Sequence, residues 1–172
     1  AEPFSSGLNG DLRLEASGGR LWKFQVMAGI FSVVNILSID ELFEEGLPYK
    51  TLSGNFTIRD GILSTEEMNL ESASLRMSAT GEIDLPNSII NGILAMHPLV
   101  TIDKIISNIP LAGYIITGKN ESTASIYFSV EGPLRHAEVS LLPVKSIEEG
   151  VLGILERLIK TPIRLLETEE RK

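Results

Sequence analysis

One run of residues has the spacing of a phosphate-binding loop. Gly113 and Gly118-Lys119 fit the pattern G-x-x-x-x-G-K, in which backbone N–H groups surround a nucleotide's phosphates. That motif continues with a Ser or Thr that binds Mg²⁺, whereas the next residue here is Asn120. Residues 122–130 then alternate as in a strand, where the motif needs a helix. The spacing therefore predicts a turn between an apolar segment and a strand, with no nucleotide site.

The histidine and paired acidic residues of the sequence show no spacing typical of a catalytic site. The chain has no Cys and only two His, His97 and His136, and neither stands at helical or strand spacing from carboxylates. A metal site or a Ser-His-Asp relay would need three side chains to converge from distant positions. The pairs Glu44-Glu45 and Glu66-Glu67 are typical of solvated helix ends and turns. We therefore expect no enzyme activity, no catalytic residues, no metal and no cofactor.

The length and the net charge of the chain indicate its domain number and exclude one class of partner. A chain of 172 residues suffices for one domain with its own core. Its 23 acidic against 15 basic residues give a net charge of -8, and no cluster of Lys and Arg interrupts this balance. Proteins that bind nucleic acid neutralise phosphates with such clusters. Nucleic acid is therefore not expected as a partner.

The elements that would have to position a site are strands that are apolar on one side. From Leu52 to Ile58 the even positions are apolar or Gly and the odd positions are polar. Asp60-Gly61 is typical of a two-residue hairpin turn, which would pair this strand with residues 62–70. Four further runs alternate in the same way and predict more strands, with Gly18-Gly19 and Gly132-Pro133 as turns: 7–15, 75–85, 122–131 and 136–142. Pro86-Asn87 separates the 75–85 run from another apolar segment, residues 88–96.

Four segments have helical patterns instead. Residues 21–37 are densely apolar, which favours a buried or sheet-covering helix over a short membrane-inserted segment. Capping residues predict short helices over 39–45 and 102–108. An amphipathic pattern predicts a C-terminal helix over 146–167, in which Pro162 should cause a kink.

Together these patterns predict a mainly β (α+β) fold. We expect a curved antiparallel sheet of about six to eight strands that forms a groove or half-barrel, covered or capped by amphipathic helices. Its apolar face is the one feature with a functional interpretation. The candidate lining residues of a groove are Leu52, Phe56, Ile58, Leu75, Met77, Ile83, Ile126, Phe128 and Val130. On the residues alone, an ordinary core under the helices is favoured over an open groove, because every one-sided sheet must bury its face.

Several segments resemble the C-terminal region of the AsmA family, including its YhdP branch. The resemblance is carried by Gly46-Leu-Pro-Tyr49, Leu52-Ser-Gly-Asn-Phe56, Ile58-Arg-Asp-Gly-Ile-Leu63, Gly81-Glu-Ile-Asp-Leu85, Ile109-Pro-Leu-Ala-Gly113 and Val130-Glu-Gly-Pro-Leu134. It extends from about Leu8 to Pro143. It implies that residues 1–172 are a single AsmA-like C-terminal domain. We expect this domain to be a fragment of a longer protein of the AsmA/YhdP/TamB type, which holds one N-terminal transmembrane helix.

The resemblance also implies a function and a location. Members of this group are understood as bridge-like lipid carriers in the envelope of Gram-negative bacteria. We therefore expect a periplasmic domain, tethered to the inner membrane by a helix absent from this fragment, that passes phospholipid acyl chains along its groove between the inner and outer membranes. Arg157, Lys160 and Arg164 on the 146–167 helix are candidates for contact with a membrane surface.

Two other functions remain open. The domain would act in outer-membrane protein assembly if its exposed strand edges paired with an outer-membrane or periplasmic protein. It would be a structural spacer if the apolar face were entirely core. Lipid class, transport direction, energy source and oligomeric state leave no mark in the sequence.

Overall fold

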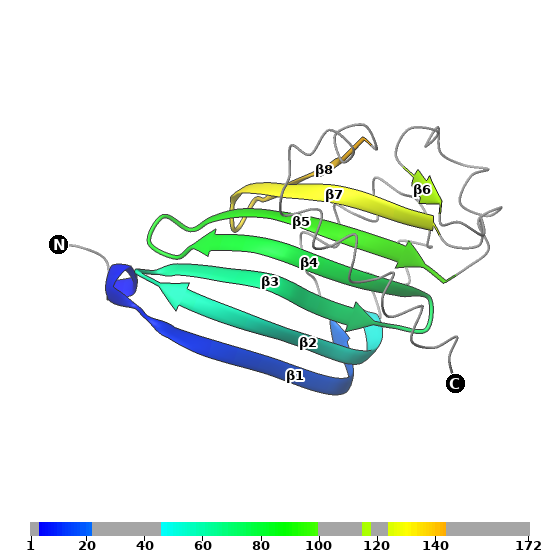
Figure 1. Cartoon of the computed structure of the whole chain (residues 1–172), viewed down its shortest axis with the longest axis horizontal. Helices are drawn as coiled ribbons and strands as arrows, with labels where there is room; N and C mark the ends of the chain where they lie inside the picture. The colour runs from blue at the N-terminus through cyan, green and yellow to red at the C-terminus, as the bar shows by residue number, and fades with distance from the viewer. Residues whose placement is uncertain (1–3, 22–45, 100–114, 118–123, 144–172) are drawn as a thin grey trace.

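The computed structural model describes residues 4–21, 46–99, 115–117 and 124–143, which form one open antiparallel β-sheet (Figure 1). The strand order is β1-β2-β3-β4-β5-β7-β6, and β8 also pairs with β7. A 3₁₀ turn, η1 (Phe4–Gly7), precedes the sheet. The strands are β1 (Gly10–Leu21), β2 (Leu47–Arg59), β3 (Ile62–Glu71), β4 (Leu75–Asp84), β5 (Ile89–Pro98), β6 (Ile115–Thr117), β7 (Ala124–Pro133) and β8 (Glu138–Leu141). The expected antiparallel sheet of six to eight strands is thus confirmed.

The hairpin turn between β2 and β3 forms where the sequence predicts it. Asp60 and Gly61 both have positive φ, 47° and 78°, which is the backbone conformation that a two-residue hairpin requires. The turn is held from both sides, because Gly61 N–H donates to the Leu8 carbonyl at 3.0 Å and its own carbonyl accepts from Leu85 N–H at 3.0 Å. Its backbone hydrogen bonds thus tie the chain before β1 and the end of β4 to one end of the sheet.

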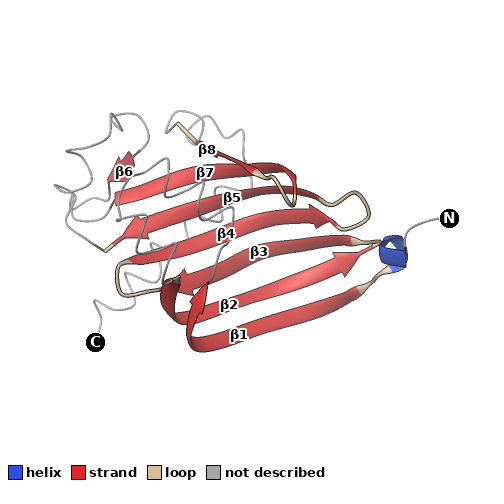
Figure 2. Ribbon diagram, turned by 180° about the vertical axis from the view of Figure 1, so that it is seen from behind, coloured by secondary structure: helices blue, strands red, loops and turns tan. Residues whose placement is uncertain are grey.

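Gly18-Gly19 is not a turn, contrary to the sequence prediction. β1 continues through both residues to Leu21, which pairs with Leu47. Gly18 has φ 63°, and Figure 2 shows the ends of β1 and β2 turning out of the plane of the sheet. Tyr49 pairs with Gly19, and its ring fills the space that a Cβ on Gly19 would occupy. Pairing with residues far along the chain thus overrides the local turn signal, and Gly18 bends the strand instead of ending it.

The last hairpin also differs from its prediction. Gly132 and Pro133 are the final residues of β7, and the chain reverses after them, where His136 N–H donates to the Pro133 carbonyl at 2.8 Å. β8 accordingly begins at Glu138 rather than at His136. Pro133 can end β7 because it lacks the N–H that a continuing strand would need.

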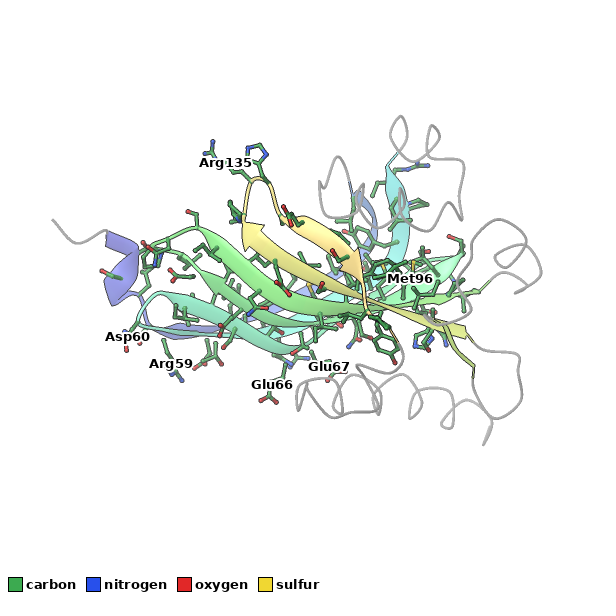
Figure 3. All side chains as sticks on the ribbon, turned by 90° about the horizontal axis from the view of Figure 1, so that it is seen from above. Arg59, Asp60, Glu66, Glu67, Met96 and Arg135 are labelled. Carbon is green, nitrogen blue, oxygen red and sulfur yellow. The ribbon has the colours of Figure 1, made fainter. Side chains whose placement is uncertain are left out.

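A bulge in β3 decides which residues share a face. The register shifts between β2 and β3 at Asn55/Thr57, and between β3 and β4 at Thr65/Met68. The extra residue of a bulge reverses which side chains face each side of the sheet. Leu63 therefore shares a face with Met68 although the two are five residues apart. In Figure 3 the side chains of Glu66 and Glu67 project from the sheet at this bulge.

The helices predicted over 21–37, 39–45, 102–108 and 146–167 lie almost wholly outside the described residues. Leu21, the exception, ends β1. Within the described ranges, no helix has the length and apolar character needed to cross a membrane. Residues 115–117, within the run from Gly113 to Lys119, form the three-residue strand β6, where the sequence predicted a turn. The remainder of that run is outside the described residues.

Candidate functional site: an apolar sheet face

The strand register aligns apolar side chains into rows that run across the sheet. Directly paired residues of antiparallel strands lie on the same face, so the rows follow from the pairing. The first row is Ala16, Leu52, Leu70, Met77, Met96 and Ile126, and the second is Leu14, Gly54, Met68, Ala79, Leu94, Phe128 and Leu141. Toward the Asp60 end, a third contains Leu12, Phe56, Thr65, Gly81, Gly92, Val130 and Val139, and a fourth contains Gly10, Ile58, Leu63, Ile83, Ile90 and Gly132.

All nine candidate lining residues lie on this one face, but their exposure divides them. Five are buried: Leu75, Met77, Ile126, Phe128 and Val130. Four are partly exposed: Leu52, Phe56, Ile58 and Ile83. The structure therefore brings the predicted residues together and separates them into a part that is core and a part that solvent reaches.

We call the buried part the closed region. It comprises the face residues of β3, β4, β5 and β7 in the first two rows, with Leu75 and Val130 beside them: Leu70, Leu75, Met77, Leu94, Met96, Ile126, Phe128 and Val130. Phe128 and Ile126 are 0% exposed and Met96 is 1% exposed. Burying one such side chain contributes about 1.5–3 kcal/mol. This region is therefore the main source of stability among the described residues.

The opposite face of the sheet is buried behind the closed region as well. The side chains of Ile93, Ala95 and Tyr127 point to that side. All three are buried, and Ala95 is 0% exposed. The polar neighbours have partners, since Ser78 Oγ donates to Asn69 Oδ1 at 2.7 Å and Thr80 Oγ1 to the Thr65 carbonyl at 2.9 Å. β4, β5 and β7 thus have buried side chains on both faces here.

Burial has an electrostatic consequence at Tyr127. Its removal from water raises the pKa of the Tyr127 phenol above the usual value, because the phenolate would lose its hydration. A hydrogen bond with Ser125 opposes this rise without cancelling it. The same Ser125 lies with its Oγ 3.0 Å from His97 Nδ1. These polar groups are part of the buried side of the sheet, opposite the apolar rows.

The fourth row is different, and we call its four central residues the open row: Ile58, Leu63, Ile83 and Ile90. They come one each from β2, β3, β4 and β5 and are all partly exposed. Adjacent strands lie about 4.8 Å apart, so the open row extends over roughly 14 Å across the sheet. It is a continuous line of branched aliphatic side chains that solvent can reach.

Glycines separate the open row from the closed region. Gly81 and Gly92 pair directly across β4 and β5 in the third row, so no side chain stands between the two parts at the middle of the sheet. Gly81 has φ 151°, and a Cβ there would lie 2.5 Å from the Gly92 Cα. Phe56 belongs to the same row on β2, where its ring covers Gly54: a Cβ on Gly54 would lie 2.9 Å from Phe56 Cε2.

The polar face at the open end is solvated and has ion pairs of its own. Arg59 lies 3.6 Å from the Asp11 carboxylate, and its side chain points away from the sheet in Figure 3. Asp84 accepts hydrogen bonds from the side chain and the backbone N–H of Asn87, which lower the pKa of its carboxyl. These exposed contacts are individually weak. They keep one side of the sheet in water while the other side is apolar.

The remaining predicted residues do not form a second site among the described residues. His136 is exposed in the β7–β8 turn, far along the sheet from His97. No three His, Asp or Glu side chains of the described ranges cluster as metal ligands would. The candidate membrane-surface residues Arg157, Lys160 and Arg164 lie outside the described residues.

Sequence reasoning missed Leu12, Leu63 and Ile90 as members of the face. Leu12 is 56% exposed on β1, in an alternating strand whose partner was not known. Leu63 and Ile90 each follow another apolar residue, Ile62 or Ile89, so alternation does not show which of the two faces the rows. The β3 bulge and the β4–β5 register decide it.

Comparison with known proteins gives one match. A protein-family model described as YhdP protein matches residues 2–139, which include every described strand up to the start of β8. No curated protein and no solved structure shows significant similarity to the chain.

Proposed function

The chain belongs to the YhdP family, a family of cell-envelope proteins in the AsmA/YhdP/TamB-type group, and we propose that its apolar sheet face is a groove for phospholipid acyl chains. The acyl chains pass along the groove between the inner and outer membranes, while headgroups stay in water. No covalent bond is made or broken. In this proposal the domain is periplasmic and is tethered to the inner membrane by another part of the protein.

The open row is the observation that supports this function best. A bilayer's hydrocarbon core is about 30 Å thick and holds two acyl chains end to end, so one chain extends about 15 Å. The open row extends over roughly 14 Å, from Ile58 on β2 to Ile90 on β5. One acyl chain therefore fits along it, across the strands. Each methylene removed from water contributes about 0.8 kcal/mol.

The other parts of the face have supporting roles in this mechanism. Phe56 and Leu12 lie in the neighbouring row and extend the apolar surface toward β1. The side chains of the closed region are buried and offer no surface to a lipid. Their role is to hold the strands in place. Contacts along the open row are dispersion contacts without direction, which allow a chain to slide from one strand to the next.

Photocrosslinking in cells tests the proposal in the full-length parent protein. A photoreactive amino acid replaces Ile83 or Ile90 on the apolar face, and its neighbour Glu82 or Asn91 on the opposite face serves as the matched control. We expect crosslinked phospholipid, detected by phosphate label, at the first pair only. Folded protein without label at either pair would contradict lipid binding on this face.

A further inference from the structure

The two ends of the open row differ in the charges that lie beyond them. The row continues onto β1 at Gly10 and onto β7 at Gly132, which are the residues opposite Ile58 and Ile90. A Cβ at either glycine would meet no atom within 4 Å, so a ligand on the row has space past both ends. The charges beyond each end therefore decide where the polar part of such a ligand lies.

Beyond the β1 end the exposed charges are mainly acidic. Asp11 follows Gly10, and Asp60 lies in the β2–β3 turn, where its N–H donates to Asn9 Oδ1 at 3.1 Å. A cation at this end, Arg59, lies 3.6 Å from the Asp11 carboxylate on the polar face. Because Arg59 is already paired, the carboxylates of Asp11 and Asp60 would repel a phosphate placed at this end.

Beyond the β7 end, Arg135 lies in the β7–β8 turn that follows Gly132. Its side chain is exposed, and in Figure 3 it projects to the side of the sheet opposite to Arg59, which is the side of the apolar face. Within the described ranges, no carboxylate forms an ion pair with Arg135. The two acids of the same hairpin, Glu131 and Glu138, lie opposite each other on the polar face. The Arg135 guanidinium can therefore bind an anion on the apolar side.

A backbone hydrogen bond holds this turn beside the open row. Leu134 N–H donates to the Ser88 carbonyl at 2.8 Å, which ties the β7–β8 turn to the hairpin between β4 and β5. Ser88 directly precedes β5, the strand that contributes Ile90 to the open row. The backbone around Arg135 is thus fixed close to the β5 end of that row.

We propose that Arg135 binds the phosphate of the phospholipid whose acyl chain occupies the open row. The lipid then lies with its headgroup toward β7 and with the end of its chain at Ile58 on β2. A guanidinium can donate two parallel hydrogen bonds to phosphate oxygens, which makes Arg well suited to this anion. The space at Gly132 takes the glycerol and ester groups between the chain and the phosphate. This inference rests on the proposed function and adds the orientation of the lipid to it.

The contact should orient the lipid more than it tightens binding. Arg135 is exposed, and ion pairs between exposed groups change an equilibrium by no more than about fivefold. The apolar contacts do not favour either orientation, because the open row is aliphatic from end to end. The attraction at Arg135 and the repulsion at Asp11 and Asp60 therefore decide the orientation together.

Spin-labelled lipids test the orientation in the 172-residue chain, with isoleucine methyl groups labelled for NMR. The probe is phosphatidylglycerol, whose only charge is its phosphate, with a nitroxide either near the headgroup or at the end of one acyl chain. The label near the headgroup should broaden Ile90 about fivefold or more relative to Ile58, because the two residues lie roughly 14 Å apart. The label at the chain end should broaden Ile58 more. Equal broadening at both residues, or the reverse order, would overturn the orientation alone, whereas no broadening along the open row would contradict lipid binding and this proposal with it.

Two arginine variants show whether Arg135 causes the orientation. Arg135→Gln should keep the lipid on the open row but lower the ratio of broadening at Ile90 and Ile58 by about threefold or more. Arg59→Gln is the matched control, because it removes an exposed guanidinium from the polar face and should leave the ratio intact. Diacylglycerol with the same labels lacks the phosphate, so in the unchanged chain it should show the low ratio of Arg135→Gln. A full ratio in Arg135→Gln or with diacylglycerol, or an equal loss in Arg59→Gln, would overturn the proposal.

Discussion

The closed region and the open row belong to the same face of the same strands but differ in what surrounds them. On β4, Met77 is 4% exposed, whereas Ile83, six residues further on, is partly exposed. Behind Met77 the opposite face is buried around Ala95, while behind Ile83 it has solvated charges such as Asp84. A single alternating pattern therefore forms a two-sided core at one end of the strand and an accessible apolar surface at the other.

Alternation of apolar and polar residues therefore does not by itself assign a function to a sheet face. A one-sided apolar pattern predicts that a face exists and which residues belong to it. Whether the face is core or binding surface depends on what covers each part. The same residue types therefore serve stability in the closed region and, in our proposal, acyl-chain binding in the open row.

The largest expected effect comes from placing a charge in each part. Met96→Lys should prevent folding, because an unpaired ammonium would be buried in the closed region at a cost of several kcal/mol. Ile83→Lys should fold, since its ammonium can reach water from a partly exposed position. Far-UV circular dichroism and thermal unfolding distinguish these outcomes. If both variants unfolded, the open row would be core as well.

Alanine substitutions at two phenylalanines of the same face should have a smaller effect on stability than a buried charge. Phe128→Ala should lower the free energy of unfolding by about 3–5 kcal/mol, because the ring is fully buried and leaves a cavity. Phe56→Ala should cost roughly half as much, because its ring is partly exposed over Gly54. Urea titration measures both values. Equal losses would contradict the division of the face.

The boundary between the two parts is tested at Gly81. Gly81→Ala should destabilise the protein by roughly 1–3 kcal/mol, since φ is 151° and the new Cβ would collide with the β5 backbone. Gly10→Ala is the control, because a Cβ there meets no atom within 4 Å. Urea titration of the pair should show a loss at Gly81 only. A neutral Gly81→Ala would mean that β4 and β5 do not approach as closely as described.

The smallest expected effect is a pH dependence that arises in the closed region. Burial raises the pKa of Tyr127 in the folded protein above the ordinary tyrosine value of 10.0. As pH rises above about 10, the unfolded chain loses this proton first, so stability present at lower pH is progressively lost. Tyr127→Phe should reduce that loss. Urea midpoints at about pH 8 and about pH 11 test this, and an unchanged alkaline loss in the variant would contradict burial of the phenol.

Much of the fold was predictable from local signals. The Asp60-Gly61 hairpin and the strands on either side follow from turn chemistry and alternation, and the structure confirms both. The continuation of β1 through Gly18-Gly19 was not predictable, because it depends on pairing with residues 47–51. Local sequence shows what a segment prefers, whereas pairing at long range decides whether a glycine pair turns the chain or only bends it.

The candidate face was predictable in its membership but not in its division. Met77 and Ile83 have the same parity on one strand, and nothing in the sequence distinguishes their exposure. Burial depends on contacts from several strands and from both sides of the sheet. The open row also contains Leu63, whose facing reverses at the β3 bulge, and a bulge between Thr65 and Met68 has no clear local signal beyond the charged Glu66-Glu67 pair.

Lipid contact at the open row can be measured on isoleucine methyl groups without any substitution. NMR spectra of methyl-labelled protein are recorded with a phospholipid that has a paramagnetic label on its acyl chain. We expect strong broadening at Ile58, Ile83 and Ile90 in the open row and little at Ile126 in the closed region or Ile93 on the opposite face. Equal broadening at Ile126, or none at the open row while the label binds elsewhere, would contradict it.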